Sequence, residues 1–108
     1  MYYEHQKGLR NEFLVEKDLR QRGWRIVAKR FKSPFAEIDL IVEKNKIVKI
    51  LEIKSLSHQS FSNFRVSARQ RVRLARAHQY FIEKWENPVE FQLAFVDPKG
   101  RIDYLDLY

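Results

Sequence analysis

The sequence predicts an α/β fold in which a mixed β-sheet of about five strands is flanked by helices. Two apolar runs, residues 38–42 and 47–53, stand on either side of a polar connector and indicate a β-hairpin. A helical pattern precedes this hairpin, a second one follows it, and two further strand patterns come last. The expected order is therefore helix, three strands, helix, two strands. With 108 residues the chain has room for one core, so we expect a single domain spanning residues 1–108.

The first helix is expected over residues 3–22. One side of it carries Leu9, Phe13, Glu16 and either Leu19 or Arg20, at spacings near 3.6 residues. Gly23 would end this helix as a C-cap. Residues 24–31 then mix apolar and basic side chains, which favours a strand that ends at the Ser33-Pro34 break.

Three charged residues interrupt the apolar hairpin: Asp39, Glu52 and Lys54. A buried ionised group costs several kcal/mol unless it is paired or neutralised, so these residues need a function. Successive strand residues alternate faces, which puts Glu52 and Lys54 on the same face. If the numbers of opposed residues sum to 91, with residues 45–46 as a two-residue turn, Asp39 lies opposite Glu52. A sum of 90 would put the two acids on opposite faces.

Two directly opposed carboxylates have Cβ atoms about 5 Å apart and repel unless a positive charge lies between them. Mg²⁺ would serve, because it prefers carboxylate oxygens and uses one or two of them together with substrate phosphate. Lys54 could then assist the attacking water or stabilise negative charge at phosphorus. Glu12 lies near the apolar side of the first helix and is expected to reach toward the same place.

A simpler interpretation of these charges stays open. Glu37 and Lys54 would form a cross-strand ion pair, Asp39 would cap a turn, and Glu12 would be a solvated helix residue.

The second half of the chain continues the α/β pattern. Ser67 is the expected N-cap of a helix running to about residue 86, which residues 87–88 end. A strand over residues 89–96, a turn over 97–100 and a last strand over 101–107 follow. The inward stripe of this second helix is expected to contain Leu74, Ala75, His78, Phe81, Ile82 and Trp85.

This second helix is strongly basic near its start. Between residues 65 and 76 there are no acids and five arginines: Arg65, Arg69, Arg71, Arg73 and Arg76. On a helix, Arg69, Arg73 and Arg76 fall within a stripe about 60° wide, on the other side from the apolar residues. Such a stripe can follow the phosphates of a nucleic acid, with Tyr80 available for stacking. A merely solvated face is the alternative.

Composition narrows the classes further. A formal net charge of +7 favours a polyanionic partner such as nucleic acid. The sequence has no Cys, which excludes a disulfide framework, a thiolate nucleophile and a zinc ribbon. No stretch approaches a membrane span, and the first residues lack an apolar signal segment, so we expect a soluble cytoplasmic protein without a membrane partner.

The order Asp39, then Glu52-Ile53-Lys54 on the next strand, resembles the core of the PD-(D/E)XK nuclease superfamily. Longer stretches look like the YraN family of small bacterial proteins over roughly residues 6 to 96. These stretches are Gly8-x-x-x-Glu12, Ala36-Glu37-Ile38-Asp39-Leu40-Ile41, Leu51-Glu52-Ile53-Lys54-Ser55 and Val66-x-x-Arg69-Gln70-x-x-x-Leu74. Leu56 stands where that family tends to have Arg, while all four candidate catalytic positions are retained.

The resemblance implies a restriction-endonuclease-like fold with a distant similarity to archaeal Holliday junction resolvases. By position it implies Glu12, Asp39, Glu52 and Lys54 as catalytic residues. Asp39 and Glu52 would hold one or two Mg²⁺ or Mn²⁺ ions, and Lys54 would assist the attacking water. Gln70 falls near the start of the second helix, where it would join Arg65, Arg69, Arg73 and Arg76 in binding nucleic acid.

The leading hypothesis is thus a metal-dependent endonuclease acting on DNA, with branched or junction DNA included. Symmetric cutting of a junction would require a homodimer. The runner-up is a nucleic-acid-binding module of the same fold that does not cleave, and a third reading is a structural or adaptor protein whose acids form only ion pairs.

Overall fold

The computed structural model describes residues 2–35, 37–56 and 67–107, with only the helical backbone described for residues 2–7. Their order confirms the predicted α-β-β-β-α-β-β sequence of elements. The elements are α1 (Tyr2–Gln21), β1 (Arg25–Lys32), β2 (Glu37–Lys44), β3 (Ile47–Ser55), α2 (Ala68–Lys84), β4 (Val89–Val96) and β5 (Ile102–Asp106).

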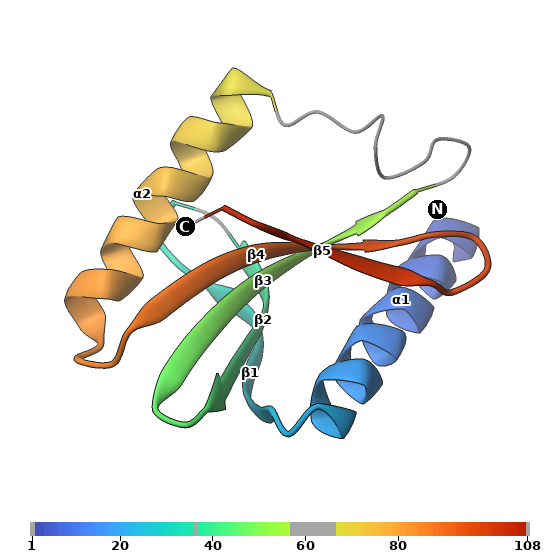
Figure 1. The fold of residues 1–108 in the computed structure, drawn as a ribbon. Helices are drawn as coiled ribbons and strands as arrows, with labels where there is room; N and C mark the ends of the chain where they lie inside the picture. The colour runs from blue at the N-terminus through green and yellow to red at the C-terminus, as the bar shows by residue number, and fades with distance from the viewer. Residues whose placement is uncertain (1, 36, 57–66, 108) are drawn as a thin grey trace.

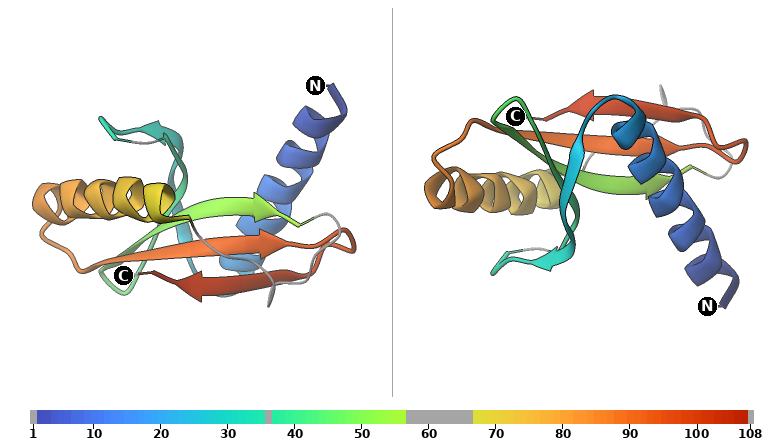
Figure 2. Two further views of the ribbon diagram at one scale, coloured as in Figure 1. Left: turned by 90° about the horizontal axis from the view of Figure 1, so that it is seen from above. Right: turned by 90° about the horizontal axis from the view of Figure 1, so that it is seen from below.

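The five strands form one mixed sheet in the order β1-β2-β3-β4-β5 (Figure 1). Neighbouring strands are antiparallel except β3 and β4, which run parallel. Parallel neighbours need a long crossover, and α2 supplies it. In Figure 2 the end of the sheet formed by β1 and β2 turns away from the other strands and lies between the two helices.

The core has two layers, one on each face of the sheet. On one face, Phe81 of α2 packs in a cluster with Ile50 and Phe91. On the other, Val15 and Leu19 of α1 pack with residues that include Leu51. Each helix therefore covers its own face, which leaves the sheet edges and strand ends as places for polar side chains.

The buried side of α1 agrees with the prediction only at Leu19. Leu9 and Phe13 are 42% and 63% exposed, whereas Asn11, Val15 and Leu19 are buried. Both sets repeat at a spacing of four, and two positions along a helix rotate a side chain by about 200°, so either set makes a continuous stripe. The stripe of Asn11, Val15 and Leu19 is the one that faces the sheet, where Asn11 donates a hydrogen bond to Ser55 at the end of β3.

The inward stripe of α2 was predicted in part. Leu74 and Phe81 are buried, and Ala77 is buried although it was not predicted. Ile82 is 42% exposed, which corrects its place in the stripe. Partial burial applies to the remaining predicted members, Ala75, His78 and Trp85.

The turns confirm the predicted register of the hairpin. Asn45 and Lys46 have φ angles of 51° and 66°, as a two-residue type I′ turn requires. The partners run from Lys44–Ile47 to Leu40–Leu51, so their numbers sum to 91.

Ser67 caps α2 by accepting a hydrogen bond from the N–H of Gln70 at 3.1 Å.

Among the described residues, neither helix is long and apolar enough to cross a membrane.

Candidate functional site

The candidate site lies where β2 separates from β3. Regular pairing of the two strands ends at Leu40 and Leu51, although both strands continue. Asp39, which precedes Leu40 in β2, contacts β3 through its side chain. Its Oδ2 atom accepts a hydrogen bond from the backbone N–H of Ile53 at 2.7 Å. Asp39 thereby holds the two strands together at the split, and it does not cap a turn.

Glu52 and Lys54 follow on β3, and one further pair in the observed register would place Asp39 opposite Glu52. The Oε1 atom of Glu52 lies 3.2 Å from Nζ of Lys54 and 3.8 Å from the Nη2 atom of Arg73 on α2. Lys54 thus pairs with Glu52, whereas the simpler interpretation paired it with Glu37. Oε2 of Glu52 is buried and has no hydrogen-bond partner among the residues that the structure describes.

An unpartnered buried carboxylate oxygen is costly, because it has lost water without gaining a donor. The side chain of Glu52 is only 15% exposed. Its free oxygen is therefore a point where a cation or a donor from a ligand would lower the free energy of the site.

The electrostatics show that the predicted residues influence one another. Burial raises the pKa of Asp39 above its ordinary value, and the hydrogen bond from Ile53 works in the opposite direction. The negative charges of Glu52 and Glu12 raise this pKa further, whereas Lys54 lowers it. The charges of Glu12, Glu52 and Lys54 thus all act on Asp39.

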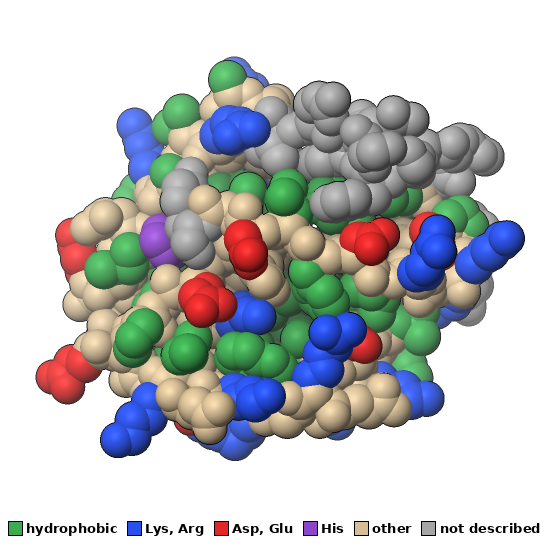
Figure 3. Space-filling model, in the orientation of Figure 1, with side chains coloured by type: hydrophobic (Ala, Val, Ile, Leu, Met, Phe, Trp, Pro, Cys, Tyr) green, Lys and Arg blue, Asp and Glu red, His purple; other side chains and the backbone are tan. Residues whose placement is uncertain are grey.

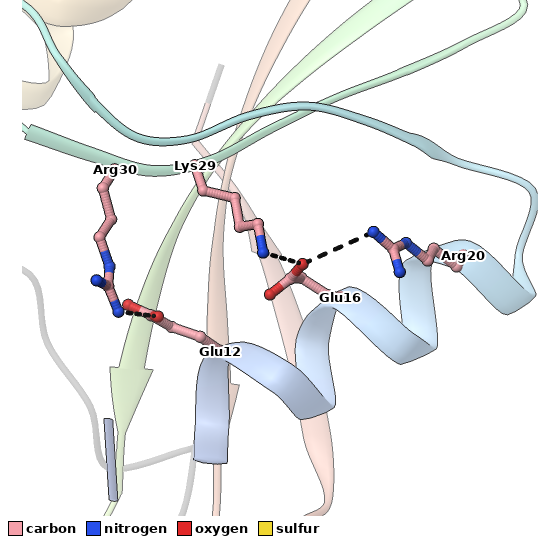
Figure 4. Close-up of polar contacts among 5 residues, drawn as sticks. All are labelled: Glu12, Glu16, Arg20, Lys29 and Arg30. Carbon is pink, nitrogen blue, oxygen red and sulfur yellow. Dashed lines mark hydrogen bonds and ion pairs between the residues drawn. The ribbon is translucent and has the colours of Figure 1, made fainter. Parts of the chain in front are cut away.

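Glu12 approaches from α1 but is already paired. Its Oε2 atom lies 2.9 Å from Nη2 of Arg30 on β1 (Figure 4). One turn further along α1, Glu16 lies 3.1 Å from Nζ of Lys29. These two ion pairs join α1 to the β1 side of the split. Glu12 acts on Asp39 electrostatically, because its negative charge raises the pKa of Asp39.

Arg30 is a member of this site that the sequence did not reveal. Its hydrogen bond and ion pair with Glu12 raise the pKa of the guanidinium, and the charges of Glu37 and Asp39 add to the effect. Arg30 has a φ angle of 51°, which is uncommon for a residue other than Gly. The backbone therefore turns at the position from which this cation meets the acids.

Asn11 is a second residue that sequence reasoning missed. It is 2% exposed and donates a hydrogen bond to the Oγ atom of Ser55, which ends β3 directly after Lys54. The contact joins α1 to the strand that carries Glu52 and Lys54. An Asn among apolar periodic residues is the available sequence signal, but it does not name a partner.

The predicted nucleic-acid-binding residues lie at the start of α2, apart from Arg65, which is outside the described residues. Arg69, Arg73 and Arg76 are exposed, and Gln70 is partly buried in the first turn. Because Arg73 reaches Glu52, the arginine stripe borders the acidic site at this residue.

The opposite signs of charge mix elsewhere on the surface. On the face seen in Figure 3, Lys and Arg side chains alternate with Asp and Glu, and hydrophobic side chains lie between them. That face offers no patch of a single sign. The arginines of α2, by contrast, have no acid on their own helix before Glu83.

No set of three His, Cys, Asp or Glu side chains is arranged to hold a metal ion within the part of the chain that the structure describes. A cation at the split would therefore have two protein carboxylates, those of Asp39 and Glu52, and would take its other ligands from water or substrate. Mg²⁺ commonly binds in this way.

The curated proteins similar to this chain include the following three. A UPF0102 protein of Campylobacter hominis is 27% identical over 104 residues, which cover 95% of this chain and 93% of the relative. UPF0102 proteins of Parvibaculum lavamentivorans and a Bradyrhizobium species are 33% and 34% identical. Both alignments cover 82% of this chain but only 66% and 65% of those relatives, slightly less than two thirds of their length. The sequence model of the family described as "Uncharacterised protein family UPF0102" matches residues 11–106, so the chain belongs to that family.

Proposed function

We propose that the protein is a metal-dependent endonuclease of the PD-(D/E)XK type, which hydrolyses phosphodiester bonds in DNA, branched DNA included. One observation carries the proposal. Asp39 and Glu52 lie on neighbouring strands where β2 separates from β3, near enough for the charge of Glu52 to raise the pKa of Asp39, and Glu52 keeps a buried carboxylate oxygen without a partner among the described residues.

The donor set fits one or two Mg²⁺ or Mn²⁺ ions. Both side chains offer hard oxygen atoms, and Asp39 still has Oδ1 while Oδ2 is bonded to Ile53. Burial raises the pKa of Asp39, and the negative charges of Glu52 and Glu12 raise it further. A divalent cation between the carboxylates would offset their mutual repulsion and would satisfy the free oxygen of Glu52.

Once bound, such a cation lowers the pKa of coordinated water and polarises the phosphate. Lys54 contributes what a cation alone cannot, a hydrogen-bond donor on a flexible stem at the same edge. It can orient the attacking water and stabilise the negative charge that develops on the phosphate oxygens. Its pairing with Glu52 at 3.2 Å holds the ammonium beside the carboxylates before substrate arrives.

The arginine stripe of α2 would bring the substrate to these residues. Arg73 lies 3.8 Å from Glu52, so a phosphate bound by Arg73 would be delivered to the carboxylates. Arg69 and Arg76 continue the stripe on either side along the helix. Arg65 and Gln70 are proposed to take part in the same contact with nucleic acid.

The test is a cleavage assay on linear duplex, single-stranded and four-way DNA with Mg²⁺ or Mn²⁺. Asp39→Asn and Glu52→Gln remove one charge each at nearly constant shape. Asp103→Asn is the matched control, because Asp103 is exposed on β5, two strands from Lys54, and makes none of the contacts described for the site. We expect the first two variants and Lys54→Gln to lose cleavage and the control to keep it. Thermal unfolding of each variant shows whether it is folded.

Two results would count against this function. DNA binding without cleavage of any form by the wild-type protein would favour a nucleic-acid-binding module. Equal residual activity in all the variants would assign the nuclease to a contaminant.

A further inference from the structure

A groove of about 400 Å³ opens beside α2. It lies further along the helix than Arg73, the residue of α2 that contacts Glu52. The residues that line it come from α2 and from the segment that follows β1. They are Pro34, Phe35, Arg76, Gln79, Tyr80 and Glu83. Of these, only Arg76 has a part in the proposed phosphate contact, so the groove itself has no function yet.

Two aromatic rings form the apolar part of the groove. The centroid of the Phe35 ring lies 6.4 Å from that of Tyr80, at an interplanar angle of 71°. Tyr80 is in turn fixed edge-on against the buried ring of Phe81, with 5.1 Å between the centroids. Phe35 itself is 44% exposed. An exposed ring on a fixed aromatic support is a stacking platform of the kind that single-stranded nucleic acids use.

The polar part of the groove can bind the edge of a planar heterocycle. Gln79 donates a hydrogen bond from Nε2 to Oε1 of Glu83 at 3.1 Å. That bond leaves the amide oxygen of Gln79 and the second carboxylate oxygen of Glu83 as acceptors, and Arg76 supplies donors. A ring face beside donors and acceptors suits a nucleobase better than it suits a purely apolar ligand.

The position of the groove relative to the acidic site sets the register of such a strand. Tyr80 follows Arg73 by seven residues, which is about 10 Å along the helix axis. Arg76 lies between them on the same stripe, so one continuous row of side chains leads from the carboxylates to the aromatic rings.

We infer that this groove stacks an unpaired nucleobase of the DNA strand whose neighbouring phosphate lies at Arg73. The inference rests on the proposed function and narrows its substrate class. A base inside a continuous duplex is stacked on its neighbours and can enter the groove only after it is unstacked and unpaired, at a cost of about a few kcal/mol. The preferred substrates are therefore single strands and the unpaired nucleotides at branches or ends.

The experiment measures binding, with EDTA present so that no cleavage is needed. A short single-stranded DNA carrying the fluorescent base 2-aminopurine is titrated with the wild-type protein, Phe35→Leu and Phe35→Trp. Phe13→Leu is the matched control, because Phe13 is an exposed aromatic residue on α1. Folding of every variant is checked by thermal unfolding, and Phe35 is exposed enough to be replaced without opening the core.

Stacking should quench the fluorescence in the wild-type complex, and Phe35→Leu should lose the quenching together with about 5- to 100-fold in affinity. Phe35→Trp should restore both, and Phe13→Leu should change neither. An unchanged affinity and quenching in Phe35→Leu, or tighter binding to a continuous duplex than to the single strand, would overturn the inference.

The two proposals fail separately. If quenching depends on Phe35 but no DNA is ever cleaved, the base site stands and the nuclease function falls. If DNA is cleaved while Phe35→Leu binds and quenches as the wild type does, the nuclease stands and the base site falls.

Discussion

The side chain of Asp39 accepts a hydrogen bond from the backbone N–H of Ile53, with 2.7 Å between Oδ2 and the nitrogen. This bond stands where the β2–β3 ladder has just ended, so one carboxylate both closes the sheet and belongs to the acidic site. The two roles can be separated by mutation.

Asp39→Asn should preserve the hydrogen bond and remove the charge, whereas Asp39→Ala removes both. We expect the Ala variant to have a lower free energy of unfolding than the Asn variant by about 1 to 2 kcal/mol, because it leaves the Ile53 N–H without its acceptor. Urea unfolding of the two variants measures the difference. Equal stabilities of the two variants would mean that the hydrogen bond between Asp39 and Ile53 does not stabilise the fold.

Arg30 offers a test of backbone strain beside the same acids. Its φ angle of 51° is in the left-handed region, which is unfavourable for a residue with a Cβ atom but not for Gly. Arg30→Gly and Arg30→Ala both lose the ion pair with Glu12, so their difference reports the backbone alone. The Gly variant should be more stable in urea by about 1 kcal/mol, and a more stable Ala variant would contradict the left-handed conformation.

The arginine stripe is tested by the salt dependence of DNA binding. If Arg73 contacts a phosphate, Arg73→Ala should reduce the magnitude of the slope of log affinity against log salt by about 0.9 for duplex DNA. Arg71→Ala is the control, since Arg71 is exposed on the same helix about 160° away from Arg73. The stripe is only solvated if both variants keep the wild-type slope.

The register and the turns could be predicted because local chemistry determines them. Residues 45–46 suit a two-residue turn, and this turn length fixes the observed pairing, whose continuation by one pair would set Asp39 opposite Glu52. The cap at Ser67 was likewise readable, because a hydroxyl before a helical pattern has one common use.

The buried side of α1 and the role of Arg30 could not be predicted in the same way. Two stripes of equal spacing compete on α1, and the choice between them depends on where the sheet lies. Arg30 reads as one more base in a basic strand until α1 brings Glu12 within 2.9 Å of it. Contacts between elements distant in sequence decide both features.

The turn between β4 and β5 predicts a pH dependence that is independent of the site. Hydrogen bonds from the backbone N–H of Arg101 and then of Lys99 hold the pKa of Asp97 below its ordinary value of 3.8. A lowered pKa in the folded state means that the ionised form stabilises the fold. This contribution is complete above the unfolded pKa and is lost as the pH falls through the folded value.

Asp97→Asn can accept the same bonds without charge. The stability difference between the wild type and this variant should therefore be present at neutral pH and disappear in strong acid, as followed by thermal unfolding. A difference that does not vary with pH would show that the charge of Asp97 contributes nothing.

The most direct test of the acidic site is the binding of Mn²⁺, followed by the electron paramagnetic resonance signal of the free ion. If Asp39 and Glu52 hold the cation, Asp39→Asn and Glu52→Gln should each weaken binding by at least about 10-fold. Lys54→Gln and Asp103→Asn should bind Mn²⁺ about as well as the wild type, since neither change removes a ligand. Wild-type affinity in both Asp39→Asn and Glu52→Gln would contradict a metal centre at the split between β2 and β3.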